Sequence, residues 1–287
     1  MLLRCRDRTL TLDVPAVMGI LNVTPDSFSD GGQHYERQAA VAAGLRMVEE
    51  GAAIIDVGGE STRPGASAVG VQQEIDRVVP VIEALAARAD VALSVDTSKP
   101  EVIAAALRAG AHLVNDIRAL RTPGALEAVA AQNAAVCVMH MQGEPATMQV
   151  DPRYDDVVAE VRAFLLGRAD ACLAAGITRD SICVDPGIGF GKTYQHNVDL
   201  LRNLRSVENL GYPLLIGVSR KGVIGIMTGR PASARVVGSA VAAAFAVQAG
   251  ASIVRAHDVA ATVDAVKVAV ALRGGESEQR NERTRAR

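Results

Sequence analysis

The sequence contains no tryptophan, and aromatic residues make up only 3% of its 287 residues. Proteins that bind single-stranded nucleic acids stack the bases on aromatic side chains, so this scarcity argues against that class. The charge balance argues the same way, because 30 Lys and Arg face 32 Asp and Glu and the net charge is -2. Such a chain has no general attraction for a phosphate backbone. We therefore expect no nucleic-acid partner, and any anion site must be local.

Cysteine is also scarce. The four cysteines, Cys5, Cys137, Cys172 and Cys183, show no C-x-x-C spacing and no grouping with histidine. This pattern disfavours a zinc site and a disulfide framework. Free cysteine packs as a small apolar residue, so we predict that Cys137 and Cys183 are buried. The cysteine usage fits a reducing compartment, and we expect a cytoplasmic protein.

Long hydrophobic runs are absent as well. The most apolar stretch, 240–254, is interrupted by Gln248 and Gly250 and falls short of the roughly 18 apolar residues that a membrane helix needs. The first residues carry charges with no apolar block behind them, which does not read as a signal peptide. We expect no membrane partner.

What the sequence does contain is a regular alternation of short β-branched runs and longer alanine-rich segments, the signature of an α/β fold. The runs are almost continuously apolar, as parallel strands covered on both faces require. The predicted strands are 17–21, 53–57, 92–95, 112–114, 136–139, 182–184, 214–218 and 252–254. The predicted helices are 36–50, 71–88, 99–109, 123–132, 155–175, 195–208, 233–249 and 259–273.

Eight strands and eight helices in about 250 residues match a single (β/α)8 TIM barrel. Strand order cannot be read from a sequence, so an open doubly wound sheet is the alternative fold. No linker divides the chain, and we predict one domain over 1–273. The tail 274–287 lacks a usable apolar face, and we predict that it is disordered.

Polar residues follow all eight predicted strands. In chain order they are Asn22, Asp56, Asp96, Asn115 with Asp116, His140, Asp185, Ser219 with Arg220 and Lys221, and Arg255 with His257. In a barrel these strand ends converge on the face at which barrel enzymes bind substrate. A single Asp or Asn after a strand is often only a turn or helix-cap residue. Agreement among all eight strands predicts an enzyme site.

The chemistry of these candidates divides into two sets. The first set combines acceptors, an amide and a donor, and consists of Asp96, Asn115, Asp185 and Lys221. Such groups suit the edge of a flat heterocycle. The second set consists of Asn22, Arg63, Arg255 and His257. Arginine and histidine donate to phosphate oxygens, and the Asn22 oxygen is a suitable hard ligand for Mg²⁺ that accompanies a diphosphate.

Three glycine-rich loops follow strands. The loops 24–32 and 58–65 have the composition of loops that close over a substrate. The third, 185–193, resembles a nucleotide-binding P-loop, but Pro186 stands where that pattern requires glycine. Its glycine spacing is also wrong for a dinucleotide fingerprint. We therefore expect this loop to present Asp185 and Phe190 to the pocket.

At these residues the sequence resembles the bacterial dihydropteroate synthase family, the folate-pathway enzymes that sulfonamides target. The resemblance extends to about Leu272 and runs through motifs at 18–32, 56–65, 94–98, 115–116, 185–187, 219–221 and 255–258. The first two motifs are long enough to be highly specific. The resemblance implies a transferase that joins 6-hydroxymethyl-7,8-dihydropterin diphosphate to para-aminobenzoate, releasing diphosphate and 7,8-dihydropteroate.

The resemblance also implies a role for each motif residue. Pterin-binding residues are Asp96, Asn115, Asp185, Lys221 and Arg255. Diphosphate-binding residues are Asn22, Thr62, Arg63, Arg255 and His257, with Mg²⁺ at Asn22. Aminobenzoate-binding residues are Phe28, Thr62, Pro64, Phe190, Ser219, Lys221 and Gly222. The expected catalytic residues are Asp96, Lys221, Arg255 and His257. Sulfonamide inhibitors and a homodimer through the alanine-rich last helices are implied as well.

One residue departs from the family. Gly222 stands where several members carry a serine that contacts the aminobenzoate carboxylate. Backbone N–H groups of the following helix still offer donors, so we expect weaker or differently tuned binding. Two other functions remain open: a pterin-dependent methyltransferase, which should lack the diphosphate-binding set, and a catalytically silent pterin-binding or scaffold paralogue.

Overall fold

The computed structural model describes residues 1–24, 32–61 and 68–273. Eight parallel strands form the barrel: β3 (Ala16–Asn22), β4 (Ile54–Gly58), β5 (Ala92–Asp96), β6 (Leu113–Asp116), β7 (Ala135–Met139), β8 (Ile182–Asp185), β9 (Leu215–Gly217) and β10 (Ile253–Ala256). Their order is β8-β7-β6-β5-β4-β3-β10-β9. A parallel bridge between Val184 and Leu214 joins the two outer strands and closes the barrel. The predicted TIM barrel is confirmed, and the open-sheet alternative is wrong.

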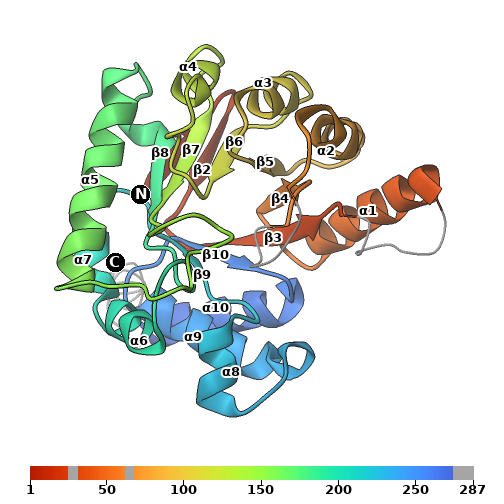
Figure 1. Ribbon diagram of the computed structural model, residues 1–287. Coiled ribbons are helices and arrows are strands. Elements are labelled where there is room, and N and C mark those ends of the chain that lie inside the picture. The colour runs from red at the N-terminus through yellow and green to blue at the C-terminus, as the bar shows by residue number, and fades with distance from the viewer. Residues whose placement is uncertain (25–31, 62–67, 274–287) are drawn as a thin grey trace, which may run out of the picture.

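Helices surround the strands, as Figure 1 shows. They are α1 (Gly32–Glu49), α2 (Val71–Ala86), α3 (Pro100–Arg108), α4 (Ala125–Ala130), α5 (Val157–Ala174), α6 (Tyr194–Arg202), α7 (Leu204–Glu208), α8 (Gly222–Thr228), α9 (Val236–Gln248) and α10 (Val259–Leu272). The single helix predicted over 195–208 is wrong, because the chain leaves helical geometry at Asn203 and forms α6 and α7. The short helix α8 was missing from the predicted helix ranges, although a helix after Gly222 was expected.

The core has two layers, which the alternation of side chains along each strand separates. On β4, Ile55 and Val57 point outward and pack in the cluster between strands and helices. Ile54 points inward and belongs to the cluster inside the barrel. Both faces of the strand are therefore buried from solvent, which explains why the sequence shows continuous apolar runs.

An amino-terminal hairpin precedes the barrel and was not predicted. Its strands are β1 (Leu2–Cys5) and β2 (Arg8–Thr11). Leu3, Cys5 and Leu12 are buried against residues from the amino-terminal ends of the barrel strands, including Met18 and Ile54. The hairpin therefore closes the end of the barrel opposite to the predicted site.

All four cysteines are free and buried, which confirms the prediction for Cys137 and Cys183. Within the described ranges, no helix is both long and apolar enough to cross a bilayer. The predicted tail 274–287 lies outside the described residues, so its disorder stays a prediction.

Candidate active site

The polar layer of the site follows from the same alternation that builds the core. Two residues after the inward-facing Ile54 comes Asp56, and along β10 Arg255 follows the inward-facing Ile253 by two. The inward positions near the strand ends also hold Asn22, Asp96, Asn115 and Asp185. A polar layer therefore lies directly on the apolar layer inside the barrel, at the carboxyl ends of the strands.

Arg255 is the centre of this layer. Its Nε donates to Asp56 Oδ2 at 2.6 Å and its Nη2 donates to Asp96 Oδ2 at 2.7 Å. Burial opposes the charge of Arg255, but Asp56 and Asp96 outweigh it and raise the pKa of the guanidinium. Burial raises the pKa of Asp96 to about 7, and Arg255 opposes this shift. The arginine thus holds two carboxylates from neighbouring strands in fixed positions.

Asp56 was predicted as one of the polar strand-end residues, but no binding or catalytic role was assigned to it. Its Oδ2 also accepts a hydrogen bond from Asn115 Nδ2 at 2.9 Å, and its side chain is fully buried. Its other oxygen, Oδ1, has no hydrogen-bond partner among the residues that the structure describes. A fully buried carboxylate with a spare acceptor is costly unless it serves the site. Its spacing from Ile54 was the signal in the sequence that could have identified it.

Lys221 and Asp185 add a second set of opposite charges to the pocket, and each influences the pKa of the other. Lys221 Nζ donates to the carbonyl oxygen of Ile188 and lies 4.6 Å from the centroid of the Phe190 ring. Burial lowers the pKa of Lys221 to about 8, and Asp185 opposes this shift. Burial likewise raises the pKa of Asp185, and Lys221 is the largest opposing influence. Phe190 therefore lies beside Lys221, as expected for this loop.

Ser219 and His257 contact each other next to this pair. Ser219 Oγ lies 3.0 Å from His257 Nδ1 and accepts a hydrogen bond from the His257 backbone N–H at 3.1 Å. Gly222 begins α8 directly after Lys221. The loops that follow β9 and β10 thus bring together donors suited to an anionic group.

Asn22 lies beside Asp96. A Cβ atom added at Gly58 would lie 3.7 Å from Asn22 Oδ1 and 3.8 Å from Asp96 Oδ2, so both oxygens face this glycine. Searched over the described residues, no group of three or more His, Cys, Asp or Glu side chains is placed to hold a metal ion. Protein ligands for Mg²⁺ at Asn22 would therefore be few.

Three polar residues at strand ends do not join the site. Asp116 accepts hydrogen bonds from the backbone N–H groups of Arg118 and Leu120, both at 2.7 Å. Arg220 binds Asp258 with two donors. His140 lies beside Lys192. These residues serve turns and loop contacts. Because Asn115 and Lys221 still represent β6 and β9 in the pocket, the expectation that every strand end contributes is wrong only at β7.

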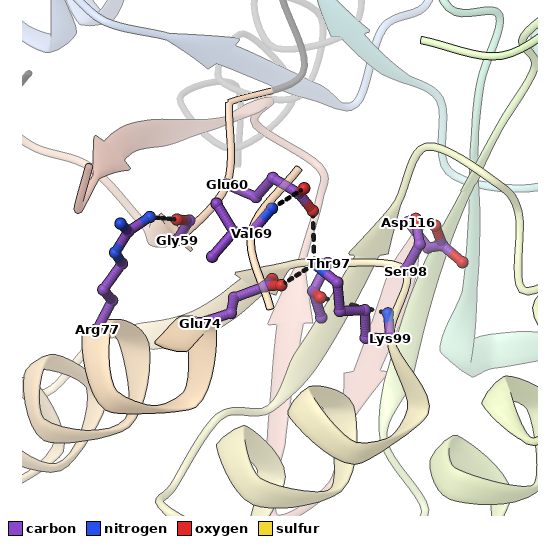
Figure 2. Close-up of polar contacts among 9 residues, drawn as sticks. All are labelled: Gly59, Glu60, Val69, Glu74, Arg77, Thr97, Ser98, Lys99 and Asp116. Atoms are coloured by element: carbon purple, nitrogen blue, oxygen red, sulfur yellow. Dashed lines mark hydrogen bonds and ion pairs between the residues drawn. The ribbon is translucent and has the colours of Figure 1, made fainter. Parts of the chain in front are cut away.

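Phe28, Thr62, Arg63 and Pro64 lie outside the described residues. Figure 2 shows the contacts at the two described ends of the segment that contains the last three. Glu60 Oε1 accepts a hydrogen bond from the Val69 backbone N–H at 2.9 Å, and Lys99 Nζ donates to Glu60 Oε2 at 2.6 Å.

The same lysine binds a second carboxylate, that of Glu74, which is fully buried on α2. Burial opposes the charge of Lys99, but its hydrogen bonds to Glu60 and Glu74 outweigh it and raise its pKa. The Glu60 carboxylate therefore connects Val69 to Lys99, which lies in the loop that follows β5 and Asp96.

Comparison with known proteins places these features in a family. Residues 18–257 match the family described as pterin binding enzyme. The dihydropteroate synthase of Haemophilus influenzae is 52% identical over 268 residues, covering 93% of this chain and 98% of the relative.

Two solved structures are similar throughout. Yersinia pestis dihydropteroate synthase in a sulfonamide drug complex has a TM-score of 0.90 and 51% identity, with 95% of this chain and 99% of that chain covered. Xanthomonas albilineans dihydropteroate synthase with 4-aminobenzoic acid has a TM-score of 0.90 and 54% identity, with 96% and 99% covered. The chain belongs to the pterin binding enzyme family.

Proposed function

We infer that this chain is a dihydropteroate synthase. It joins para-aminobenzoate to 6-hydroxymethyl-7,8-dihydropterin diphosphate and produces 7,8-dihydropteroate and diphosphate. The observation that carries this conclusion is the 52% identity to a named synthase over 93% of the chain. Arg255 and His257 belong to the predicted diphosphate-binding set. A pterin-dependent methyltransferase should lack this set, so their presence argues against that function.

The inward polar layer binds the pterin ring in this proposal. Asp96, Asn115, Asp185 and Lys221 contact the ring edge, and Arg255 lies against the ring. Among the described residues, the ion pair of Asp96 with Arg255 uses Oδ2, and we propose that Oδ1 accepts from the ring. Asp185 and Lys221 offer an acceptor and a donor on the other side of the pocket.

The reaction begins when the bond between the pterin methylene carbon and the diphosphate oxygen breaks. The electron pair leaves with diphosphate, and a delocalised cation remains on the pterin. The Asp96 carboxylate stabilises this charge as it develops, in a site that excludes water. The amine nitrogen of aminobenzoate then bonds to the methylene carbon, and the proton that it loses passes to the released diphosphate. This amine is neutral near pH 7, so it needs positioning more than a general base.

Diphosphate is bound by Asn22, Thr62, Arg63, Arg255 and His257 in this proposal. Mg²⁺ fits the described residues as an ion that arrives with the substrate, because it is commonly held by one or two protein oxygens together with phosphates and water. Asn22 Oδ1 would be its protein ligand. When bound, Mg²⁺ offsets the negative charge of the leaving diphosphate.

Aminobenzoate binds between the loops that follow β8 and β9. Phe190, Ser219, Lys221 and Gly222 form the described part of its pocket, and Phe28, Thr62 and Pro64 are proposed to complete it. Sulfonamides are proposed inhibitors, since a sulfonamide complex of the similar Yersinia pestis enzyme is known.

Release of diphosphate from the pterin substrate tests the proposed function. We expect wild-type protein to release diphosphate with Mg²⁺ and aminobenzoate, and the Asp96→Asn variant to lose at least about 100-fold in kcat, as when a group that stabilises transition-state charge is removed. Asp170→Asn, an exposed change on α5, is the control and should retain full activity. An inactive wild-type protein that still binds pterin would instead support the silent paralogue.

We also propose that the protein forms a homodimer through α9 and α10. Val237, Val241 and Phe245 are exposed at four-residue spacing along α9, and Val268 and Leu272 are exposed on the adjacent α10. Apolar groups gathered in this way mark association surfaces more often than isolated ones do. Light scattering should give the mass of two chains for wild type and a lower mass for Phe245→Asp. A wild-type mass of one chain at micromolar concentration would overturn this proposal.

A cytoplasmic location is proposed on the chemistry of the cysteines. All four are free and buried, which suits a compartment that keeps thiols reduced.

A further inference from the structure

Lys192 belongs to the glycine-rich loop that resembles a P-loop, yet the proposed reaction gives it no role. Its side chain is 3% exposed, and its ammonium group lies among four acceptors. Nζ is 2.9 Å from Phe190 O, 3.0 Å from Gly187 O, 3.3 Å from His140 O and 2.9 Å from His140 Nδ1. Burial lowers the pKa of His140 to about 3, so its ring is neutral and Nδ1 can accept.

The acceptors come from two different loops. Gly187 and Phe190 belong to the loop between β8 and α6, whereas His140 directly follows β7. Three carbonyl oxygens aimed at one point repel one another unless a cation or donor lies between them. The ammonium group of Lys192 therefore closes the β8–α6 loop on itself and ties it to the end of β7.

The glycines of the β8–α6 loop allow its backbone to lie close to the backbone of the loop that follows β7. A Cβ added at Gly187 would lie 1.9 Å from His140 O, and one added at Gly191 would lie 2.3 Å from Gln142 O. Both glycines also have positive φ, 67° and 59°. Tyr154 Oη donates to Gly191 O at 2.7 Å, which adds a second tie. The backbone is folded against the β7 loop, and its glycines do not cradle a phosphate.

The β8–α6 loop contributes Phe190 to the proposed aminobenzoate pocket. Phe190 packs against a small cluster of Ile117, Met139, Met141 and Met148, and its ring lies beside the Lys221 ammonium group. Lys221 itself donates to the carbonyl oxygen of Ile188 in the same loop. The conformation of this loop thus determines where Phe190 and Lys221 lie.

We propose that Lys192 is a positioning residue whose Nζ, by donating to these converging acceptors, holds the β8–α6 loop in its conformation and thereby places Phe190 and Lys221 for aminobenzoate. This inference rests on the proposed synthase function. The presence of lysine at position 192 supports the proposal, because lysine is rare in this chain. Only four of the 30 basic residues are lysines, namely Lys99, Lys192, Lys221 and Lys267. A compact ammonium group fits among converging carbonyl oxygens, whereas a planar guanidinium does not.

Steady-state kinetics with both substrates tests the proposal. For Lys192→Met we expect KM for aminobenzoate to rise about tenfold or more, as misplacement of a substrate-contacting group predicts, with KM for the pterin diphosphate changed less than about twofold. Lys192→Arg should not restore the wild-type value. Lys267→Met, an exposed change on α10, is the control and should behave as wild type.

Rescue by small cations separates positioning from general stability. Lys192→Ala leaves the acceptors facing an open space, so ammonium or methylammonium chloride should lower KM for aminobenzoate, and tetramethylammonium chloride at equal ionic strength should not. Equal losses with both substrates and no rescue would show a merely structural role and overturn the proposal.

A milder variant keeps the proposal testable if the Lys192 variants do not fold. Tyr154→Phe removes one tie to the same loop, and loss of one hydrogen bond should raise KM for aminobenzoate about two- to threefold. An unchanged KM in this variant would overturn the inference while wild-type turnover leaves the synthase function intact. Absence of wild-type turnover in the same assay would overturn both.

Discussion

Gly222 shows how a single side chain tunes the proposed aminobenzoate pocket. Apart from its chain neighbours and the backbone of its own helix, no described atom lies within 4 Å of the place where a Cβ would stand, so a serine fits at the start of α8. Its hydroxyl would add a donor next to Lys221. We expect Gly222→Ser to lower KM for aminobenzoate about three- to tenfold, the effect of one added hydrogen bond to a charged group.

Steady-state kinetics checks this expectation. Gly167→Ser is a matched control, since it lies on α5 with equally open space around its Cβ position in the described structure. An unchanged or raised KM for aminobenzoate in Gly222→Ser would count against the role given to this position.

Asp96 should make stability depend on pH in a defined direction. Burial raises its pKa to about 7 in the folded protein, whereas an aspartate in an unfolded chain titrates near about 3.9. Between these values the folded protein holds a proton that the unfolded chain has lost, so the free energy of unfolding falls as the pH rises through this window. The stabilisation is complete below about pH 4 and is lost above about pH 7.

Urea unfolding of wild type and Asp96→Asn at several pH values tests this dependence. From about pH 5 to about pH 8, wild type should lose roughly 2–3 kcal/mol relative to the variant, which has no titrating group at position 96. Parallel pH dependences for the two proteins would contradict the raised pKa.

Residue by residue, the site was predictable where the position along a strand decides which way a side chain points. Asn22, Asp96, Asn115, Asp185 and Arg255 were all predicted, and all face the barrel interior. Side chains alternate along a strand, so a shift of one residue reverses the direction. Sequence alone does not fix where a strand begins.

This explains the errors at the same scale. Asp116 follows the inward-facing Asn115 and His140 follows Met139, so both turn away from the pocket. Arg220 lies in a loop with a positive φ of 58°, beyond the reach of strand alternation. Asp56 points into the barrel, as Ile54 does, but no binding role was predicted for it.

Among the elements, the amino-terminal hairpin should contribute to stability and not to substrate binding. Leu3 is fully buried against the apolar layer at the closed end of the barrel. We expect Leu3→Ala to lower the free energy of unfolding by about 2–5 kcal/mol, the usual cost of a large-to-small change in a core. KM for both substrates should not change, because the polar layer lies at the other end.

Leu2→Ala provides the control from the same strand. Leu2 is 54% exposed, so its truncation should change stability by no more than about 0.5 kcal/mol. Urea unfolding of both variants measures the difference, and equal destabilisation by the two changes would refute the role of the hairpin as a closing element.

Elements with strong local signals were the predictable ones. The eight barrel strands were found within one or two residues, because each is a buried apolar run. The hairpin has strands of only four residues, and its turn carries Arg6 and Asp7 in place of glycine or asparagine. The helix α8 contains Gly222 and Gly225 within seven residues, which gives it a weak helix propensity. Tertiary packing of Val223 and Ile224 stabilises it instead.

At the scale of the whole molecule, the barrel is joined least firmly between β8 and β9. In the described part of the chain this junction is a single bridge, with the Val184 N–H donating to Pro213 O at 3.0 Å. By contrast, β3 and β4 pair from Met18 to Asn22. We expect the Val184 amide to exchange with deuterium at least about tenfold faster than amides of the β3–β4 ladder, since local opening follows the weakest pairing.

Hydrogen exchange resolved by NMR measures these rates directly. Amides of the β4–β5 ladder serve as a second reference, because that ladder is also continuous. Equal protection at Val184 and in both ladders would show that the barrel opens as one unit.

The architecture as a whole was predictable because alternation of strands and helices is a property of the entire chain. Closure of the barrel was predicted from the count of eight strands and eight helices and from the family resemblance, since strand order itself depends on contacts between distant segments. The barrel domain was assigned to 1–273 and the tail to 274–287, and the character of that tail stays a prediction.

The amino-terminal hairpin, which closes the end of the barrel beneath the polar layer, has a consequence for how the substrates enter the site. With Leu3, Cys5 and Leu12 packed on the inner apolar layer, the described residues close the amino-terminal end of the barrel to a substrate. The pterin, which sits deepest in the proposed arrangement, must arrive before aminobenzoate blocks its way. If both substrates bind as proposed, we therefore expect the pterin diphosphate to add before aminobenzoate.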